Sequence, residues 1–304
     1  MKKKNKLVLT VFLGTLEIVI LLLGIFSFLF FNAIGKKDKN TQRLTAASMD
    51  HSAWITNGKL HIAGEKYEGQ EQAEKWKNLE QVAISDDHLL ALDKHGEVYA
   101  IGSNSSLQCE INGQKNVIYI ETGLQCSIAV MDNGTVKIYG VLDESWQKVL
   151  LQEEKVMAVS IGDRHFVVLY TDGKVAAYGD NANGQCDVQQ WKDITKVMVG
   201  YDFTVGLTKE GNVLFAGNKG NFQDNSLTEW KDITGIAAGS DYIVAVDKFG
   251  FVYAAGDNRQ GQCDVSNWHQ VESIAAGYDH TVALGKNNEL LAAGYNGNGQ
   301  CNGN

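Results

Sequence analysis

The sequence contains no proline, and its 304 residues include only five cysteines. Turns must therefore be made by its 32 glycines together with Asn and Asp. The odd number of cysteines and the lack of a CxxC pair argue against a disulfide framework. The phosphate-loop, G-x-S-x-G, HExxH and dinucleotide-binding motifs are also missing, so we assign no catalytic residue, metal ligand or cofactor and expect a protein that is not an enzyme.

Positive charge is scarce beyond the first 43 residues. That segment holds eight Lys or Arg against Glu17 and Asp38, whereas the other 261 residues carry 19 basic and 34 acidic side chains. A globular part this acidic cannot neutralise a phosphate backbone. Nucleic acid is therefore not an expected partner.

One long hydrophobic run, residues 7–31, lies near the start of the chain. Its length is enough to cross a hydrocarbon core of about 30 Å as a helix. It predicts a short basic tail at 1–6, a transmembrane signal anchor at 7–34 and a linker at 35–43. A cleaved signal peptide is the alternative. Because Lys2–Lys6 flank the run together with the amino terminus, we expect a single-pass protein of the bacterial cell membrane with its large domain outside the cell.

Residues 44–304 are a sevenfold repeat of 38 or 39 residues. A first glycine stands in a turn before a short apolar strand, a second closes that strand, and a Ser or Gly precedes each unit. The first marker occurs at Gly58, Gly96, Gly134, Gly173, Gly211, Gly250 and, as a replacement, Asn288; the second occurs at Gly64, Gly102, Gly140, Gly179, Gly217, Gly256 and Gly294. The apolar runs between them are short and rich in Val, Ile and Ala, which indicates about three β-strands per unit with a possible short fourth.

Seven β-units of this length predict an all-β, seven-bladed β-propeller, because radial repetition protects strand edges. The last unit ends after Cys301 without the strand that should complete it. The segment 42–48 resembles that missing strand, with Ala46-Ala47-Ser48 aligned to Ala275-Ala276-Gly277. We therefore expect the amino-terminal strand to pair within the last blade and close the ring.

The repeats resemble those of the regulator of chromosome condensation family. That family's strand and turn patterns are matched by His280-Thr-Val-Ala-Leu and by Asn298-Gly299-Gln300. The short blades are more similar to the secreted bacterial propeller that inhibits β-lactamases than to the eukaryotic nucleotide-exchange protein. The resemblance covers residues 44–304 and implies a binding platform rather than a particular partner.

Histidine and cysteine both fall at repeated positions. His51, His88, His165 and His280 share one position with Cys126, Phe203 and Tyr242, so a packed ring position is favoured over a metal ring. Cys109, Cys186, Cys263 and Cys301 each lie seven residues after a second glycine. Equivalent positions in different blades are too far apart for a disulfide, so these thiols are expected to be reduced and structural.

The residue pair just before the histidine position varies between units and is expected to gather at one end of the ring. From it we predict a partner-binding rim of acidic and tyrosine side chains, comprising Asp50, Asp87, Arg164, Tyr201, Asp202, Asp241, Tyr278 and Asp279. Solvated turns are the alternative. The sequence favours a non-enzymatic, membrane-anchored platform that binds a protein or a cell-envelope component. Two alternative functions stay open: an inhibitor of a secreted or cell-wall enzyme, and a propeller lyase that acts on a wall polymer or a peptide.

Overall fold

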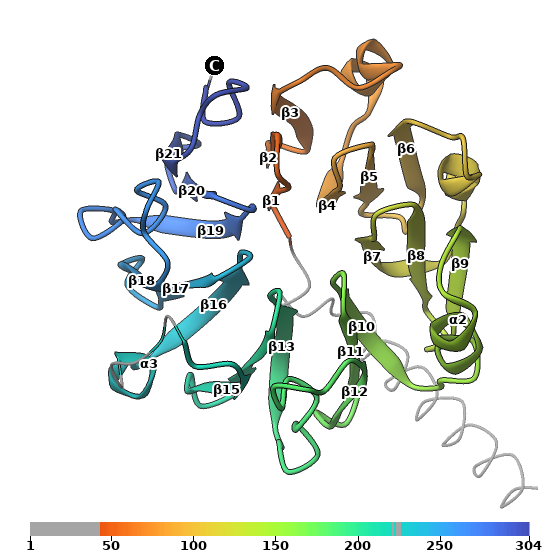
Figure 1. The fold of residues 1–304 in the computed structure, drawn as a ribbon. Coiled ribbons are helices and arrows are strands. Elements are labelled where there is room, and N and C mark those ends of the chain that lie inside the picture. The colour runs from red at the N-terminus through yellow and green to blue at the C-terminus, as the bar shows by residue number, and fades with distance from the viewer. Residues whose placement is uncertain (1–42, 221, 223–225, 304) are drawn as a thin grey trace, which may run out of the picture. The chain divides into compact units, whose positions relative to one another are not determined.

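The computed structural model describes residues 43–220, 222 and 226–303. Within these residues, strands form seven antiparallel three-stranded sheets, which are the blades of a ring (Figure 1). Each sheet contains three strands that are consecutive in the chain. The blades are β1 (Thr45–Ala47), β2 (His51–Thr56) and β3 (Lys59–Gly64); β4 (Leu79–Ile84), β5 (His88–Asp93) and β6 (Val98–Gly102); β7 (Val117–Thr122), β8 (Cys126–Met131) and β9 (Val136–Gly140); β10 (Val156–Ile161), β11 (His165–Tyr170) and β12 (Val175–Gly179); β13 (Ile194–Val199), β14 (Phe203–Thr208) and β15 (Val213–Gly217); β16 (Ile233–Ala238), β17 (Tyr242–Asp247) and β18 (Val252–Gly256); and β19 (Val271–Ala276), β20 (His280–Gly285) and β21 (Leu290–Gly294). This arrangement confirms the all-β, seven-bladed fold.

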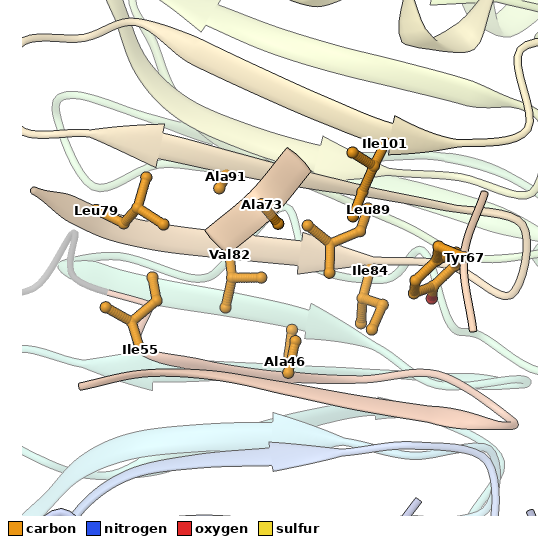
Figure 2. Packing of buried hydrophobic residues seen from close by; sticks show 11 residues of the cluster. Ala46, Ile55, Tyr67, Ala73, Leu79, Val82, Ile84, Leu89, Ala91 and Ile101 are labelled. Carbon is orange, nitrogen blue, oxygen red and sulfur yellow. The ribbon is translucent and has the colours of Figure 1, made fainter. Parts of the chain in front are cut away.

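The core lies between neighbouring blades. Both faces of a middle strand are covered, and every residue of β5, β8 and β20 is buried. Between the first two blades, Ala46 and Ile55 pack against Val82 and Leu89 (Figure 2). Small and branched apolar side chains let such sheets approach closely, and burial of each large one contributes roughly 1.5–3 kcal/mol.

The second glycine of each repeat is required by the close approach of two backbone segments. Gly102 has φ +104°, and a Cβ atom there would lie 2.4 Å from the carbonyl oxygen of Asp87. The next residue, Ser103, donates its backbone N–H to that same oxygen at 2.8 Å. The glycine therefore holds the outer strand against the loop that carries the variable residue pair.

Four of the connections between blades contain a short helix, whereas the sequence had left a short fourth strand as a possibility in each unit. They are η2 (Gln70–Lys75), η3 (Gln108–Ile111), α2 (Glu144–Leu150) and α3 (Ser226–Glu229). In the part of the chain that the structure describes, no sheet has a fourth strand. Asp143 caps the amino end of α2, because its side chain accepts hydrogen bonds from the backbone N–H groups of Ser145 and Trp146.

The predicted exchange of the amino-terminal strand is wrong. Strand β1 pairs with β2 of its own blade, with Thr45 opposite Trp54, and the last blade is completed by β19. A repeat has the same period wherever the blade is taken to begin, and here each blade begins with the strand that ends just before the variable residue pair. Side chains and loops join the last blade to the first instead. The Nδ2 atom of Asn298 donates to Asp50 at 2.5 Å, and Gln300 donates to the carbonyl of Met49 at 3.2 Å.

The predicted localisation is also corrected. Among residues 43–220, 222 and 226–303, no helix is long and apolar enough to cross a membrane, which contradicts the expected placement of the protein in the cell membrane. The predicted tail and anchor, residues 1–34, lie outside the described residues, as does most of the linker.

Candidate functional site at the mouth of the ring

The inner strands of all seven blades end around a cavity of about 800 Å³. We call this end of the ring the mouth face. The variable pairs lie here, because each follows an inner strand directly. The first member of each pair lines the cavity, and these residues are Met49, Asp86, Leu124, Asp163, Tyr201, Ser240 and Tyr278. The sequence therefore identified correctly which loops meet at one end of the ring.

The predicted rim residues divide into two groups. Tyr201 and Tyr278 line the cavity, with 43% and 47% of their surfaces exposed. The other six are second members of their pairs and do not line it: Asp50, Asp87, Arg164, Asp202, Asp241 and Asp279. Their backbones lie against the second glycines, as described for Asp87, and most of their side chains contact neighbouring residues. Whether any of the eight binds a partner is a prediction.

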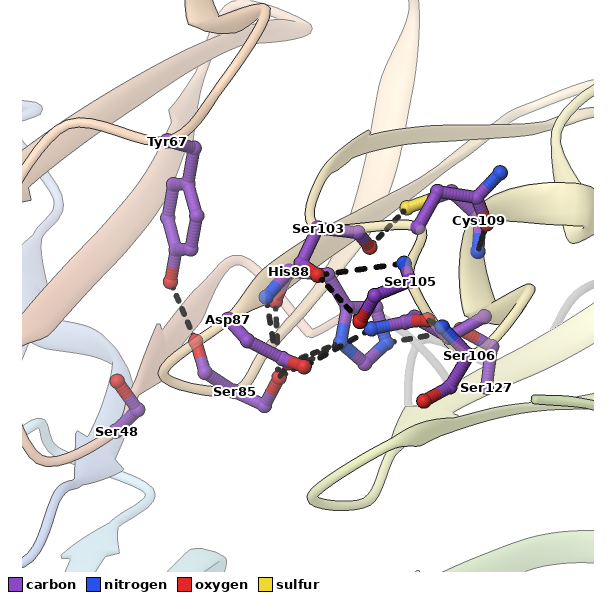
Figure 3. A network of polar contacts seen from close by, with 12 residues as sticks. Ser48, Tyr67, Ser85, Asp87, His88, Ser103, Ser105, Ser106, Cys109 and Ser127 are labelled. Atoms are coloured by element: carbon purple, nitrogen blue, oxygen red, sulfur yellow. Dashed lines mark hydrogen bonds and ion pairs between the residues drawn. The ribbon is translucent and has the colours of Figure 1, made fainter. Parts of the chain in front are cut away.

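Asp87 is the centre of a polar network that joins two blades (Figure 3). Its Oδ1 atom lies 2.7 Å from Nδ1 of His88, and its Oδ2 atom accepts a hydrogen bond from Gln108 at 2.9 Å. The second imidazole nitrogen of His88, Nε2, lies 2.9 Å from the hydroxyl of Ser127 in the next blade. The carboxylate therefore positions a structural histidine rather than projecting freely into solvent.

All four repeated histidines are buried, as the sequence predicted, and three of them, His88, His165 and His280, contact a hydroxyl of the next blade. The Nε2 atom of His165 lies 2.8 Å from Oγ1 of Thr204, and His280 makes the same contact with Ser52. Burial lowers the pKa of His165 and of His280 to about 4, because the apolar interface disfavours the charged ring. No group of three metal-ligating side chains is placed to hold a metal ion within the described residues.

The cysteines are free thiols. The Sγ atom of Cys186 donates to the carbonyl oxygen of Asp180 at 3.3 Å, and Cys263 contacts Asp257 in the same way. Burial raises the pKa of Cys186 to about 11, and the charge of Asp180 adds to this effect. A thiol held protonated is a poor nucleophile, and the two contacts hold Cys186 and Cys263 against the turn that follows the second glycine.

Sequence reasoning missed the apolar sector of the cavity. Leu124 and Val141 are 70% and 60% exposed, Met49 is 46% exposed, and the helix α2 adds Trp146 to the lining. The signal was present in the third repeat. There, residues 141–155 replace the usual Asn-Gly-Gln turn with a hydrophobic, helix-forming segment. Exposed apolar side chains grouped around a cavity are typical of a binding surface.

A second unexpected group of residues lies on the inner strands. Arg43 donates to Glu121 at 2.6 Å, and the hydroxyl of Tyr119 donates to the same carboxylate at 3.0 Å. Burial raises the pKa of Glu121, while the charge of Arg43 opposes that rise. Burial, followed by the charge of Arg43, lowers the pKa of Lys196 to about 8. Arg43, which precedes β1, thus interacts with Glu121 on β7 and, through its charge, with Lys196 on β13, and the repeat pattern did not indicate this.

Three segments of the chain match the model of the regulator of chromosome condensation (RCC1) repeat, namely residues 80–108, 157–185 and 271–300. The human probable E3 ubiquitin-protein ligase HERC6 is 29% identical over 135 residues, which cover 43% of this chain and 11% of HERC6. The chain thus spans about a tenth of the length of that relative.

Solved structures show the same fold at low identity. Prp20p from Saccharomyces cerevisiae, studied for its binding to Gsp1p and histones, has a TM-score of 0.60 and 16% identity, covering 86% of this chain and 84% of that chain. The ectodomain of the receptor kinase CR4 from Physcomitrella patens has a TM-score of 0.63 and 12% identity, covering 84% and 74%. The chain therefore has the propeller fold of these proteins, and three of its seven blades match the regulator of chromosome condensation repeat.

Proposed function

We propose that this protein is a non-catalytic scaffold whose mouth face binds a protein partner. The supporting observation is the group of exposed apolar side chains around the cavity, above all Leu124, Val141 and Tyr278. Water-exposed apolar surface of this kind is stabilised when a partner covers it. A standard interface buries about 800 Å² on each partner, which is the scale of one end of a propeller.

The composition of this face fits a protein better than a small metabolite. The cavity is wide, and its lining comes from every blade, so a ligand that filled it would contact many separate loops. Tyrosine and other large apolar side chains dominate the energetics of protein interfaces. The carboxylates of Asp86 and Asp163 lie beside them and would steer a positively charged surface towards the mouth.

The proposal is tested by affinity capture with full-length protein and matched variants. Leu124→Ser and Tyr278→Ala alter the mouth face, whereas Phe249→Ser and Phe251→Ser alter the hairpin between β17 and β18 at the other end of blade six. Phe249 and Phe251 are 61% and 52% exposed, so their substitution removes an amount of exposed apolar surface comparable to that removed by the mouth-face variants. A partner should be captured by the wild type and by the hairpin variants. Its affinity for each mouth variant should fall about tenfold or more.

The opposite pattern would place the interface elsewhere. Loss of the partner with the Phe249 and Phe251 variants, but not with the mouth variants, would move binding to the hairpin end. Circular dichroism melting of all four variants gives the necessary control, because each altered side chain is exposed and should leave the melting temperature nearly unchanged.

A further inference from the structure

The mouth face contains an internal binding site for an arginine side chain. Arg164, in the fourth blade, donates through Nη2 to Asp180 at 2.5 Å and through Nη1 to Asp202 at 2.9 Å. Its guanidinium carbon lies 5.2 Å from the centre of the Tyr201 ring. Two carboxylates and an aromatic face therefore hold one planar cation between the fourth and fifth blades.

The same acceptors recur two blades further on without the arginine. Asp257 follows Gly256 as Asp180 follows Gly179, and the pair Tyr278-Asp279 takes the place of Tyr201-Asp202. The backbone geometry is matched as well. Asp180 donates its N–H to the carbonyl of Arg164 at 2.8 Å, and Asp257 donates to the carbonyl of Asp241 at 2.9 Å. Asp241 therefore occupies the position of Arg164.

Because Asp241 stands where the fourth blade has Arg164, the location between the sixth and seventh blades is rich in negative charge. Arg259 pairs with Asp257 at 2.8 Å, but its side chain is 82% exposed. Among the described residues, no hydrogen bond reaches the carboxylate of Asp279. Burial raises the pKa of Asp279, and the charges of Asp257 and Asp241 raise it further, against the opposing charge of Arg259. Asp257 is thus paired with Arg259 and also accepts a hydrogen bond from Gln262 at 3.1 Å, whereas Asp279 is the carboxylate without a hydrogen-bond donor among the described residues.

The arrangement fits a guanidinium better than a metal ion. A metal requires several ligand atoms converging within a little over 2 Å of one point. In the described part of the chain, no three acidic, His or Cys side chains are placed in that way. A guanidinium presents donors spread over a plane and stacks on an aromatic ring, as Arg164 does on Tyr201. The ring of Tyr278 is 47% exposed and available for such a contact.

We infer that the sixth and seventh blades form a binding site for an arginine side chain of the protein partner, held by Asp257, Asp279 and the face of Tyr278. This inference rests on the proposed function, because the arginine belongs to the protein that docks on the mouth face. The partner must therefore present an arginine side chain beside its apolar surface.

The site can be tested with a defined probe. We would titrate full-length protein with the peptide acetyl-Gly-Arg-Gly-amide and follow the Tyr278 ring and the Asp279 carboxyl by NMR. The citrulline peptide is the control, because it keeps the shape of arginine and loses the charge. The arginine peptide should shift both signals and the citrulline peptide should bind at least tenfold more weakly. Equal binding of the two peptides would overturn the inference.

Two variants test the comparison between the location that Arg164 fills, between the fourth and fifth blades, and the proposed site between the sixth and seventh blades. Asp241→Arg places a guanidinium where Arg164 stands in the fourth blade, so it should fill the site and weaken peptide binding at least tenfold. Arg164→Asp recreates the sequence of the open location between the fourth and fifth blades, so it should add a second binding site, seen at Tyr201. Unchanged peptide binding by Asp241→Arg contradicts the inference, whatever the other variant does.

The capture experiment separates this inference from the proposed function. If the partner is lost with Leu124→Ser and also with Asp241→Arg, both are supported. If it is lost with Leu124→Ser and retained by Asp241→Arg, the mouth face binds the partner and the arginine site is wrong. If the Leu124 and Tyr278 variants both retain the partner, the proposed function fails, even where the peptide binds.

Discussion

The Nε2 atom of His280 in the last blade lies 2.8 Å from the hydroxyl oxygen of Ser52 in the first. The same contact joins His88 to Ser127 and His165 to Thr204 between consecutive blades. The junction between the two ends of the propeller is therefore made as an ordinary blade interface. It does not need a strand from one end of the chain to complete a sheet at the other.

Because these contacts are equivalent, two substitutions that are far apart in sequence should lower the free energy of unfolding by equal amounts. Ser52→Ala and Ser127→Ala should each lower the free energy of unfolding by about 1–2 kcal/mol, because each leaves a buried histidine nitrogen without its partner. Chemical denaturation of both variants measures the costs. If Ser127→Ala is destabilising and Ser52→Ala is neutral, the first and last blades are not joined as described.

Acid should weaken the blade interfaces before it affects most carboxylates. His165 and His280 have folded pKa values of about 4 against an ordinary 6.5. As the pH falls from 6.5 to 4, both imidazoles therefore become protonated in the unfolded chain while they stay neutral in the folded chain. Stability is complete above pH 6.5 and is lost through that window, by on the order of 3 kcal/mol per histidine at its lower end.

The pH dependence can be assigned to one residue by substitution. His165→Gln keeps a side-chain N–H donor for Thr204 and has no charge to gain. The slope of unfolding free energy between pH 7 and pH 5 should become smaller in this variant than in the wild type. An unchanged slope would mean that folding does not lower the pKa of His165.

A serine at position 162 should stabilise the fourth blade. Thr204 donates its hydroxyl proton to the carbonyl of Gln185 at 2.7 Å, so Nε2 of His165 must be the donor to Thr204, and Nδ1 is an acceptor. Among the described residues this Nδ1 atom has no partner. In the second blade, Ser85 places its hydroxyl 2.8 Å from Nδ1 of His88. Gly162→Ser puts a hydroxyl at the equivalent position and should add about 0.5–1.5 kcal/mol.

The matched control is the same change in the last blade. A Cβ atom at Gly162 meets the Val199 side chain at 3.1 Å, which a small movement can relieve. At Gly277 it would lie 2.2 Å from the backbone oxygen of Ser48, so Gly277→Ser should be destabilising. Comparison with Gly162→Ala separates the new hydrogen bond from the loss of backbone freedom. A Gly162→Ser variant no more stable than Gly162→Ala would refute the hydrogen bond.

Removing the charge of Lys196 should stabilise the propeller at neutral pH. Its pKa is about 8 in the folded chain against an ordinary 10.5, so the folded state disfavours the ammonium form. Stability is lost as the pH falls from 10.5 through 8, and at pH 7 the cost is on the order of 3 kcal/mol or less. Lys196→Met should therefore raise the free energy of unfolding at pH 7, and the gain should shrink at pH 9.5. Lys192→Met, at an exposed lysine, should change little at either pH.

The sequence by itself determined the number of blades and the loops that meet at one end of the ring. Seven glycines such as Gly102 recur because each faces a carbonyl oxygen too close for any side chain, so their spacing reports the backbone geometry directly. The histidine position could also be recognised as packed, because Phe203 and Tyr242 substitute for histidine there.

Tertiary structure alone decided where each blade begins and what the rim residues contact. A periodic sequence is unchanged when its unit is shifted, so the pairing of β1 with β2 could not be read from the repeat. Arg164 and Asp202 are 38 residues apart and meet because neighbouring blades place equivalent loops side by side. The exposed Leu124 and the half-buried Lys196 likewise owe their surroundings to several blades at once. Periodicity determines the ring, but the side-chain contacts between its blades determine the chemistry of its mouth.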